Sequence, residues 1–337
     1  MAKKKNLFLR RAVVIAATTP LVITDVIYRR NFRVREKPPT GFREYFMAEN
    51  PDLKAEDFSC LSDKGDLLRG IQLAARTGQP KGLIVLTHGY HRSIENYFPE
   101  AAAFARAGYM VIMFDGTGVG SSEGKGILGL PQHVLDMKTV LDRIEEDPEL
   151  SRLPLLLYGH SWGGYAADTV FCLKQYNVRG IISVAAFNDP NEIARPSIVR
   201  RIGVLHTAVI PVFNSMMQLK YGKLNRYTSA EGLARTDCPV LAVHSRDDSI
   251  VDYTESYLKI CKALEGHKGF EHWLLTGRNH NVVTPPDIDQ RERELYRKFD
   301  EQGYIMKEEE MELWQLLSRK DDEMIAKFVD FYDRCLE

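Results

Sequence analysis

The pentapeptide GHSWG, residues 159–163, places a serine between glycines where an apolar run gives way to a helical pattern. A serine hydroxyl is a weak nucleophile at neutral pH, and it needs a base beside it and donors for the oxyanion that it generates. A sharp strand-to-helix turn supplies the place for both, because it exposes the serine at the tip of a sheet in front of a helix N-terminus. The pattern therefore predicts Ser161 as a catalytic nucleophile.

The glycines explain how such a turn is built. It brings the positions two before and two after the serine close together, and a Cβ at Gly159 or Gly163 would clash there. Gly164 lets the helix start beside the neighbouring strand. The plainer interpretation of the same residues is an ordinary glycine turn with a helix-capping serine.

The other members of a triad are expected in the order serine, acid, histidine. The segment SRDDSIV, residues 245–251, follows a predicted strand and offers both Asp247 and Asp248 as the acid. The segment RNHNVV, residues 278–283, follows another strand and places His280 in a loop. Open α/β sheets carry their sites at the C-terminal ends of the strands, so these loops are expected to meet.

The segment LTHGY, residues 86–90, is the predicted oxyanion loop. The backbone N–H of Tyr90 is the expected first donor, and the N–H of Trp162 is the second. We expect His88 to hold this loop by hydrogen bonds. Five other histidines lack the required place and order and are interpreted as surface or packing residues: His91, His160, His206, His244 and His272.

Strands and helices alternate along most of the chain. Two strands joined by the turn DKGD are followed by buried strands expected near residues 82–90, 109–115, 153–159, 180–187, 238–245 and 271–277. Helices are expected near residues 93–108, 131–147, 162–176, 253–266 and 322–337. This order predicts an α/β fold with a mostly parallel sheet and helices on both faces. Residues 188–235 break the alternation and are expected to form a helical insertion.

The segment DGTGVG, residues 115–120, does not fit a dinucleotide loop, because its glycine spacing is wrong and no helix follows promptly. The motifs HGY, DGTGVGSSEG, GHSWGG, HSRDDSIV and GRNH together resemble the α/β-hydrolase superfamily, within the group of serine aminopeptidases, monoglyceride lipases and lysophospholipases. The resemblance covers residues 55–280 and the last helix. It implies an α/β-hydrolase fold with a helical cap. It also implies that Asp248 rather than Asp247 is the acid of the triad, because the family has an apolar residue three positions after the acid, and Val251 fits that position.

The expected organisation has three parts. Residues 1–40 form a basic and apolar N-terminal segment and linker, residues 41–187 and 236–337 form the hydrolase core, and residues 188–235 form the cap. The charged stretch 283–320 departs from the family pattern, and the sequence assigns it no role.

The expected chemistry is hydrolysis of a carboxylic ester, of a lipid or another acyl group, through an acyl-enzyme on Ser161, with no metal or organic cofactor. Residues 188–228 hold six basic and two acidic side chains, which suits a neutral or anionic ester better than an ammonium-bearing peptide. The alternatives are a peptidase, amidase or thioesterase with the same triad, and a hydrolase-fold protein without activity.

The composition limits the classes of partner and ligand to be expected. The net charge of −1 gives no general attraction to nucleic acid, and the five scattered cysteines form neither a zinc motif nor a disulfide framework, which favours a reducing compartment. The oligomeric state is left open.

The N-terminus is expected to contact a membrane through residues 1–35. An apolar stretch, residues 12–28, lies between basic clusters and contains Asp25 and Pro20. Such a stretch suits an interfacial or short spanning helix, and basic flanks on both sides leave its orientation open. We expect a membrane-associated or singly anchored protein with a cytoplasmic catalytic domain. The alternative is a helix packed on the hydrolase domain of a soluble cytoplasmic protein.

Overall fold

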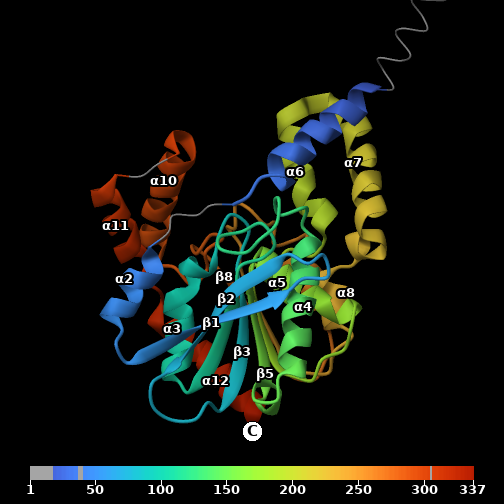
Figure 1. Ribbon diagram of the computed structural model, residues 1–337. Helices are drawn as coiled ribbons and strands as arrows, with labels where there is room; N and C mark the ends of the chain where they lie inside the picture. The colour runs from blue at the N-terminus through green and yellow to red at the C-terminus, as the bar shows by residue number, and fades with distance from the viewer. Residues whose placement is uncertain (1–17, 37–40, 304–305) are drawn as a thin grey trace, which may run out of the picture.

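One eight-stranded sheet organises the chain in the computed structural model, which describes residues 18–36, 41–303 and 306–337 (Figure 1). The strand order is β1-β2-β4-β3-β5-β6-β7-β8, and β2 runs antiparallel to both of its neighbours while the pairs from β4 to β8 are parallel. The mostly parallel sheet predicted from the sequence is confirmed. The strands are β1 (Leu53–Leu61), β2 (Leu67–Ala75), β3 (Gly82–Thr87), β4 (Tyr109–Phe114), β5 (Leu155–His160), β6 (Val178–Val184), β7 (Val240–Ser245) and β8 (Phe270–Leu275).

The central strands are apolar runs because both faces of the sheet are covered. Every residue of β3, β5 and β7 is buried. Successive side chains point to opposite faces of a strand, so Leu83 and Val85 enter one core while Ile84 and Leu86 enter the other.

Helices cover the two faces separately (Figure 1). The first core takes side chains from α4 (Gln132–Glu146), α5 (Trp162–Thr169) and α9 (Tyr257–Ala263). The second takes them from α2 (Phe42–Glu49), α3 (Phe98–Arg106), α10 (Pro286–Gln302), α11 (Lys307–Leu317) and α12 (Asp322–Leu336). The short 3₁₀ segment η1 (Ile94–Tyr97) precedes α3.

Helix α5 is shorter than the sequence predicted. It ends at Thr169 and continues only as a 3₁₀ turn, Val170–Cys172. The β-branched pair Thr169 and Val170 lies at this change, and such residues lose side-chain freedom in a helix. Helix α8 (Ser229–Leu233) presses on the same place, because a Cβ at Gly232 would lie 2.0 Å from the carbonyl oxygen of Asp168.

Residues 188–235 fold as helices beyond the C-terminal edge of the sheet. Helix α6 (Pro190–Ile202) rises from the edge, and α7 (His206–Tyr221) returns beside it before α8 (Figure 1). By length and composition alone, the stretch Pro190–Leu233 would be apolar enough to cross a membrane. It is divided at Gly203 and Gly222 and is not one continuous helix.

The N-terminal helix, described from residue 18 to residue 32, lies across α6 and α7 (Figure 1). The ring of Phe32 lies 6.1 Å from that of Phe213 in α7, and the hydroxyl of Tyr28 donates to the carbonyl oxygen of Leu128 at 3.2 Å. The described part of the segment thus packs on the rest of the chain. Residues 1–17, which carry the first basic cluster and the start of the apolar stretch, lie outside the described residues.

One buried carboxyl group lies between the sheet and α8. Asp168 is completely buried in α5, and its Oδ2 accepts a hydrogen bond from Ser183 Oγ at 2.8 Å. Its Oδ1 has no partner among the described residues. Burial raises the pKa of Asp168 to about 7, because the hydrogen bond offsets only part of the cost of desolvating the charge.

Asp168→Asn should therefore stabilise the protein more at pH 8 than at pH 5. The folded-state pKa lies above the unfolded value of about 4, so the wild type loses stability as pH rises between these values, whereas asparagine does not ionise. We expect the difference in Tm between variant and wild type to be larger at pH 8 than at pH 5 by at least about 2 °C. Asp57→Asn, on the exposed face of β1, is the control and should change Tm little at either pH. A difference for Asp168→Asn that does not vary with pH would contradict the argument.

Candidate active site

The structure brings Ser161, Asp248 and His280 together at the C-terminal edge of the sheet. His280 Nε2 lies 2.9 Å from Ser161 Oγ, and His280 Nδ1 lies 2.8 Å from Asp248 Oδ2. Since an ionised carboxylate only accepts, Nδ1 carries the proton, and Nε2 is free to accept the serine hydroxyl hydrogen. The three residues follow β5, β7 and β8, which are parallel and end at the same edge.

Ser161 occupies a strained backbone conformation. Its φ is 56° and its ψ is −113°, outside the regions that side chains other than glycine usually adopt. Its N–H donates to the carbonyl oxygen of Val184 at 2.8 Å, which fixes the turn to β6. Strain of this kind persists only where the surroundings enforce it, and it is concentrated at functional sites.

The predicted close packing around the turn is confirmed. A Cβ at Gly163 would lie 2.2 Å from the carbonyl oxygen of Thr87, and one at Gly159 would lie 2.4 Å from that of Gly163. A Cβ at Gly164 would lie 2.7 Å from Cβ of Ala186, just beyond β6. The turn is therefore wedged against the end of β3 and against the segment that follows β6.

Asp248 is held on both of its oxygens. Oδ1 accepts from the N–H groups of Ile250 and Val251 at 2.8 and 2.9 Å, and His244 Nε2 approaches Oδ2 at 3.2 Å. Burial alone would raise the pKa of Asp248, but the hydrogen bonds from His244 and His280 outweigh burial and hold the pKa well below its usual range. The carboxylate thus stays ionised beside His280.

Asp247, the second candidate for the acid of the triad, makes no contact with His280 and bonds to other groups. Its Oδ1 accepts from Ser245 Oγ at 2.6 Å and from the N–H of Gly277 at 2.7 Å. Its Oδ2 accepts from the N–H of Asn279 at 3.2 Å. Asp247 therefore braces the loop after β7 against the loop that carries His280.

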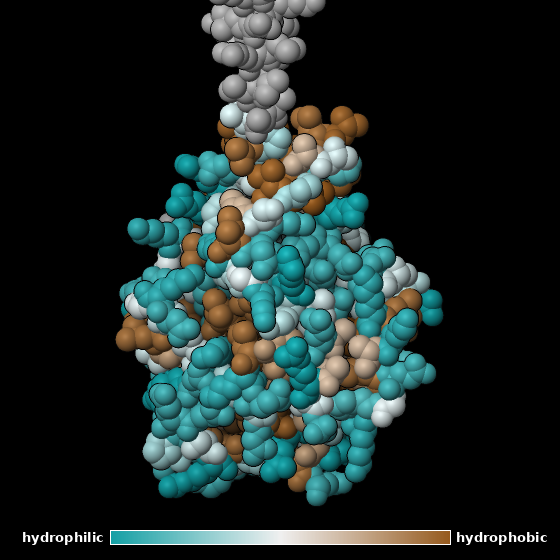
Figure 2. Space-filling view, turned by 90° about the vertical axis from the view of Figure 1, so that its right-hand side faces the viewer, coloured by the Kyte–Doolittle hydropathy of each residue, from teal (hydrophilic) through white to brown (hydrophobic). Residues whose placement is uncertain are grey.

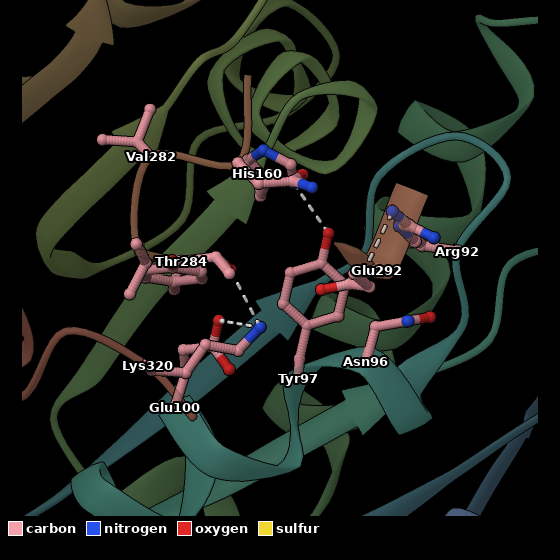
Figure 3. Close-up of a pocket in the computed structure, with 12 residues that line it drawn as sticks. Arg92, Asn96, Tyr97, Glu100, His160, Val282, Thr284, Glu292 and Lys320 are labelled. Atoms are coloured by element: carbon pink, nitrogen blue, oxygen red, sulfur yellow. Dashed lines mark hydrogen bonds and ion pairs between the residues drawn. The ribbon is translucent and has the colours of Figure 1, made fainter. Parts of the chain in front are cut away.

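Two histidines that the sequence did not place at the site lie beside the triad. His244 contacts Asp248, as above. His160 Nε2 lies 3.0 Å from the carbonyl oxygen of His280, and its Nδ1 lies 2.7 Å from the hydroxyl of Tyr97 (Figure 3). The carbonyl can only accept, so Nε2 carries the proton and Nδ1 accepts from Tyr97. Burial and the neighbouring His280 lower the pKa of His160 to about 3, which keeps it neutral. The position of His160 directly before Ser161 was the sequence feature that could have placed it at the site.

The loop after β3 lies against the nucleophile. A Cβ at Gly89 would lie 3.4 Å from Cβ of Ser161, and Tyr90 is the next residue. Trp162 is the first residue of α5, where backbone N–H groups have no partner within the helix. Within the described part of the chain, we find no hydrogen bond from the N–H of Tyr90 or of Trp162. Both predicted oxyanion donors thus flank Ser161 and remain available.

His88 fixes this loop from behind, as expected. Its Nε2 accepts from the N–H of Gly116 at 3.0 Å, so its Nδ1 donates to the carbonyl oxygen of Gly89 at 2.8 Å. Burial and the neighbouring His133 lower the pKa of His88 to about 3. The glycine-rich segment 115–120 therefore supports the loop that carries Tyr90.

Two clefts of different chemistry meet at Ser161. One, of about 800 Å³, is apolar on most sides and is lined by Ile27, Asn31, Phe32, Tyr90, Leu130, Phe187, Ile193, Ala194, Ile198, Arg201, Phe213, Ile250 and Val251. The other, of about 1160 Å³, is lined by Glu36, Gly89, Tyr90, His91, Arg92, His160, Ile250, His280, Asn281, Arg293, Tyr296 and Phe299. The N-terminal helix, α6 and α7 wall the apolar cleft, whereas α10 walls the second cleft, whose lining mixes charged with apolar side chains.

Comparison with known proteins gives consistent matches. The family model of the serine aminopeptidases, S33, matches residues 78–231. A monoacylglycerol lipase of Mycolicibacterium smegmatis is 36% identical over 87 residues, which are 25% of this chain and 30% of the relative. A human monoglyceride lipase is 27% identical over 188 residues, which are 56% of this chain and 55% of the relative. The matched parts thus span less than two thirds of either relative.

A solved structure of the Pyrococcus furiosus esterase Pf2001 is similar over most of the chain. The comparison covers 89% of this chain and 100% of the esterase, with a TM-score of 0.59 and 13% sequence identity. At this identity the likeness shows a shared fold.

Gly163→Val should destroy the turn. Its side chain would meet the backbone of Thr87, which cannot move without displacing β3. We expect loss of soluble protein or loss of Ser161 labelling by a fluorophosphonate, detected by mass spectrometry. The control is Gly65→Ala, where nothing lies within 4 Å of the added Cβ, so that its only cost is the strain of a positive φ in an exposed turn. Gly65→Ala should label normally, and normal labelling of Gly163→Val would show that the turn is looser than its contacts indicate.

Proposed function

The chain is a member of the α/β-hydrolase superfamily, and on that premise we propose that it is a serine hydrolase of carboxylic esters. One observation carries the proposal. A strained serine with a positive φ has its hydroxyl 2.9 Å from a histidine, and that histidine is 2.8 Å from a buried carboxylate. A helix cap or an ordinary glycine turn requires neither contact.

The proposed reaction has two steps. Ser161 Oγ attacks the ester carbonyl while His280 Nε2 takes its proton, and Asp248 stabilises the imidazolium. The oxyanion lies between the N–H groups of Tyr90 and Trp162. Collapse of the intermediate breaks the carbonyl–oxygen bond, and His280 protonates the departing alcohol. Water then attacks the acyl-enzyme, again through His280, and releases the acid and free Ser161.

The apolar cleft suits an acyl chain. In this proposal residues 41–187 and 236–337 are the catalytic core, and residues 188–235 are a cap that supplies Ile193, Ile198 and Phe213 to the cleft. Apolar surface gains about 25 cal/mol for each Å² removed from water, so a longer chain binds more tightly until the cleft is full. Medium or long acyl esters, including lipid esters, are therefore the proposed substrates.

The alternative is hydrolysis of amides or thioesters by the same residues, and the matching family model is named for aminopeptidases. An aminopeptidase needs a carboxylate for the substrate ammonium group. Glu36 lines the second cleft, but its Oε2 already lies 3.0 Å from His91 Nδ1. The geometry therefore favours the ester, and a panel of p-nitrophenyl esters of varied chain length beside aminoacyl anilides and acyl thioesters separates the classes.

Ser161→Ala should abolish turnover of the preferred ester and fluorophosphonate labelling while leaving the fold intact. Asp248→Asn should lower kcat by orders of magnitude, about 10⁴-fold in the best-studied triad, because His280 loses its orienting acceptor. Steady-state kinetics on the preferred ester measure both.

Asp247→Asn is the matched control, one residue away on the same loop. It should cost stability rather than kcat, since Asp247 contacts Ser245, Gly277 and Asn279 and not His280. A serine variant with near wild-type activity would overturn the proposed nucleophile, and reversed effects of the two aspartate variants would overturn the choice of Asp248.

We also infer that the protein associates with a membrane surface at the free end of the cap. Exposed apolar side chains of the N-terminal helix, Leu21 and Val22, are 57% and 61% exposed. Val204, in the turn between α6 and α7, is 83% exposed, and Leu205 follows it. Figure 2 shows apolar surface at this upper end of the molecule. The apolar tip consists of five exposed side chains: Leu21, Val22, Val26, Val204 and Leu205.

Basic side chains flank the apolar tip, and Arg29, Arg30, Arg200 and Arg201 are all exposed. Apolar side chains surrounded by arginines suit the interface of a bilayer that contains anionic lipids. The walls of the apolar cleft belong to the same helices, so a lipid ester would have a short way from the bilayer to Ser161.

Val204→Ser/Leu205→Ser should weaken binding to vesicles of phosphatidylcholine and phosphatidylglycerol by at least about tenfold, because two apolar side chains no longer enter the interface. Co-sedimentation measures it. Leu61→Ser, at an exposed apolar position on β1, is the control and should bind as wild type does. Removal of residues 1–36 is a poorer test, because it would strip Ile27 and Phe32 from the cleft.

Equal binding by the tip variant and wild type would remove the tip from the membrane contact. A wild-type chain that does not sediment with either anionic or neutral vesicles would overturn the membrane proposal as a whole.

A further inference from the structure

We propose that α10 is a positioning element that holds the oxyanion loop and the His280 loop at a fixed separation. The inference rests on the proposed function, and it assigns a role to the charged stretch that separates this chain from the family pattern. Asp289, Glu292 and Tyr296 carry it, each through a different partner.

These three side chains lie on one face of α10, because spacings of three and four residues repeat on the same side of a helix. Ile288 and Leu295 on this face are buried in apolar surroundings. The polar members of the face are buried or half-buried as well. The adjoining side, turned towards α11, carries Arg291 and Lys298, which pair with Glu312 and Glu309 of α11.

Each polar side chain on the face contacts a different part of the site. Asp289 Oδ1 accepts from Asn281 Nδ2 at 2.5 Å, next to His280 in the chain. Tyr296 accepts from Asn96 Nδ2 at 2.5 Å, next to Tyr97. One helix face is thus joined to the loop of the general base and to the segment beneath the oxyanion loop.

Glu292 makes the central contact. Its Oε1 lies 3.2 Å from Arg92 Nη2, two residues after Tyr90, and its side chain is 3% exposed (Figure 3). The guanidinium group of Arg92 also lies over the ring of Tyr296, 4.1 Å from its centre. The second oxygen, Oε2, is buried and has no partner among the described residues, and Glu292 is one of the residues that line a small cavity together with Arg92 and Lys320.

A buried ion pair adds little net stability to the packing of a helix. Desolvation of two charges offsets most of their attraction, and apolar residues of similar size often stabilise a fold as well or better. Here the ion pair and the stacking of the Arg92 guanidinium group over the Tyr296 ring together hold Arg92 against one face of α10. Positioning of the loop after Gly89, rather than stability, is therefore the role that this contact serves.

The ion pair between Arg92 and Glu292 affects the proposed reaction by positioning the oxyanion donors relative to His280. Displacement of reacting groups by about 1 Å can cost 10²-fold in rate. A loosened α10 would let the loop of Tyr90 and the loop of His280 move apart, whereas the apolar cleft proposed for the acyl chain takes no wall from α10 and would keep its shape. The loss should therefore appear in kcat, with KM nearly unchanged.

The test compares Glu292→Gln and Tyr296→Phe with Glu312→Gln, which breaks the ion pair between α10 and α11 on the outer side of the helix. On the preferred ester, kcat should fall about 10–100-fold for Glu292→Gln and less for Tyr296→Phe, with KM within about twofold of wild type. Glu312→Gln should keep the wild-type kcat and label normally with fluorophosphonate.

A double variant, Arg92→Met/Glu292→Leu, separates positioning from stability. It replaces the ion pair with apolar side chains, so Tm should return to the wild-type value or exceed it while kcat stays low. Recovery of kcat together with Tm would overturn the proposal, as would a folded Glu292→Gln variant with wild-type kcat.

Hydrogen exchange makes the test independent of the substrate. Amides of residues 88–92 and 279–284 should exchange faster in Glu292→Gln than in wild type and Glu312→Gln. Unchanged exchange would overturn the role of α10 even if no ester is cleaved. Absence of labelling and turnover in wild type would instead overturn the proposed ester hydrolase.

Discussion

The hydrogen bond from His160 Nε2 to the carbonyl oxygen of His280 is the contact on which the alignment of the site depends. It joins the turn of Ser161 to the loop of His280, the proposed nucleophile and base. On the other side of the ring, Tyr97 donates to His160 Nδ1 and accepts from the N–H of Gly89 at 2.9 Å. Loops from three different strands thus share one buried chain of hydrogen bonds with a single direction. The parallel strands bring the loops to one edge, and this chain sets their relative positions.

Local patterns predicted much of this arrangement. The apolar runs of β3, β5 and β7 indicated strands buried on both faces, and the glycines at 159 and 163 indicated a turn too tight for a Cβ. Contacts between distant segments were not predictable in the same way. Arg92 and Glu292 are 200 positions apart, and a run of charges such as residues 283–320 looks like a solvated surface until its partners are known. His160 was interpreted as a packing residue because its partners, Tyr97 and His280, lie 63 and 120 positions away in the chain.

Ser161 lies between two covers that differ in chemistry. On one side, α6, α7 and the N-terminal helix present aliphatic and aromatic side chains. On the other side, α10 presents Arg293, Tyr296 and Phe299. The hydropathy of the N-terminal helix could not distinguish packing from the proposed membrane contact, because its two ends differ: Phe32, near its C-terminal end, is buried against Phe213, whereas Leu21 and Val22, near its described start, are exposed.

The N-terminal helix also reaches the reaction centre, since the hydroxyl of Tyr90 donates to the carbonyl oxygen of Asn31 at 2.9 Å. Under the proposed function, one short peptide therefore combines a membrane-facing end, a wall of the acyl cleft and a support for an oxyanion donor. Exchange of this peptide between homologues is then expected to change membrane attachment, chain-length preference and turnover together, so that these three properties would evolve as a unit.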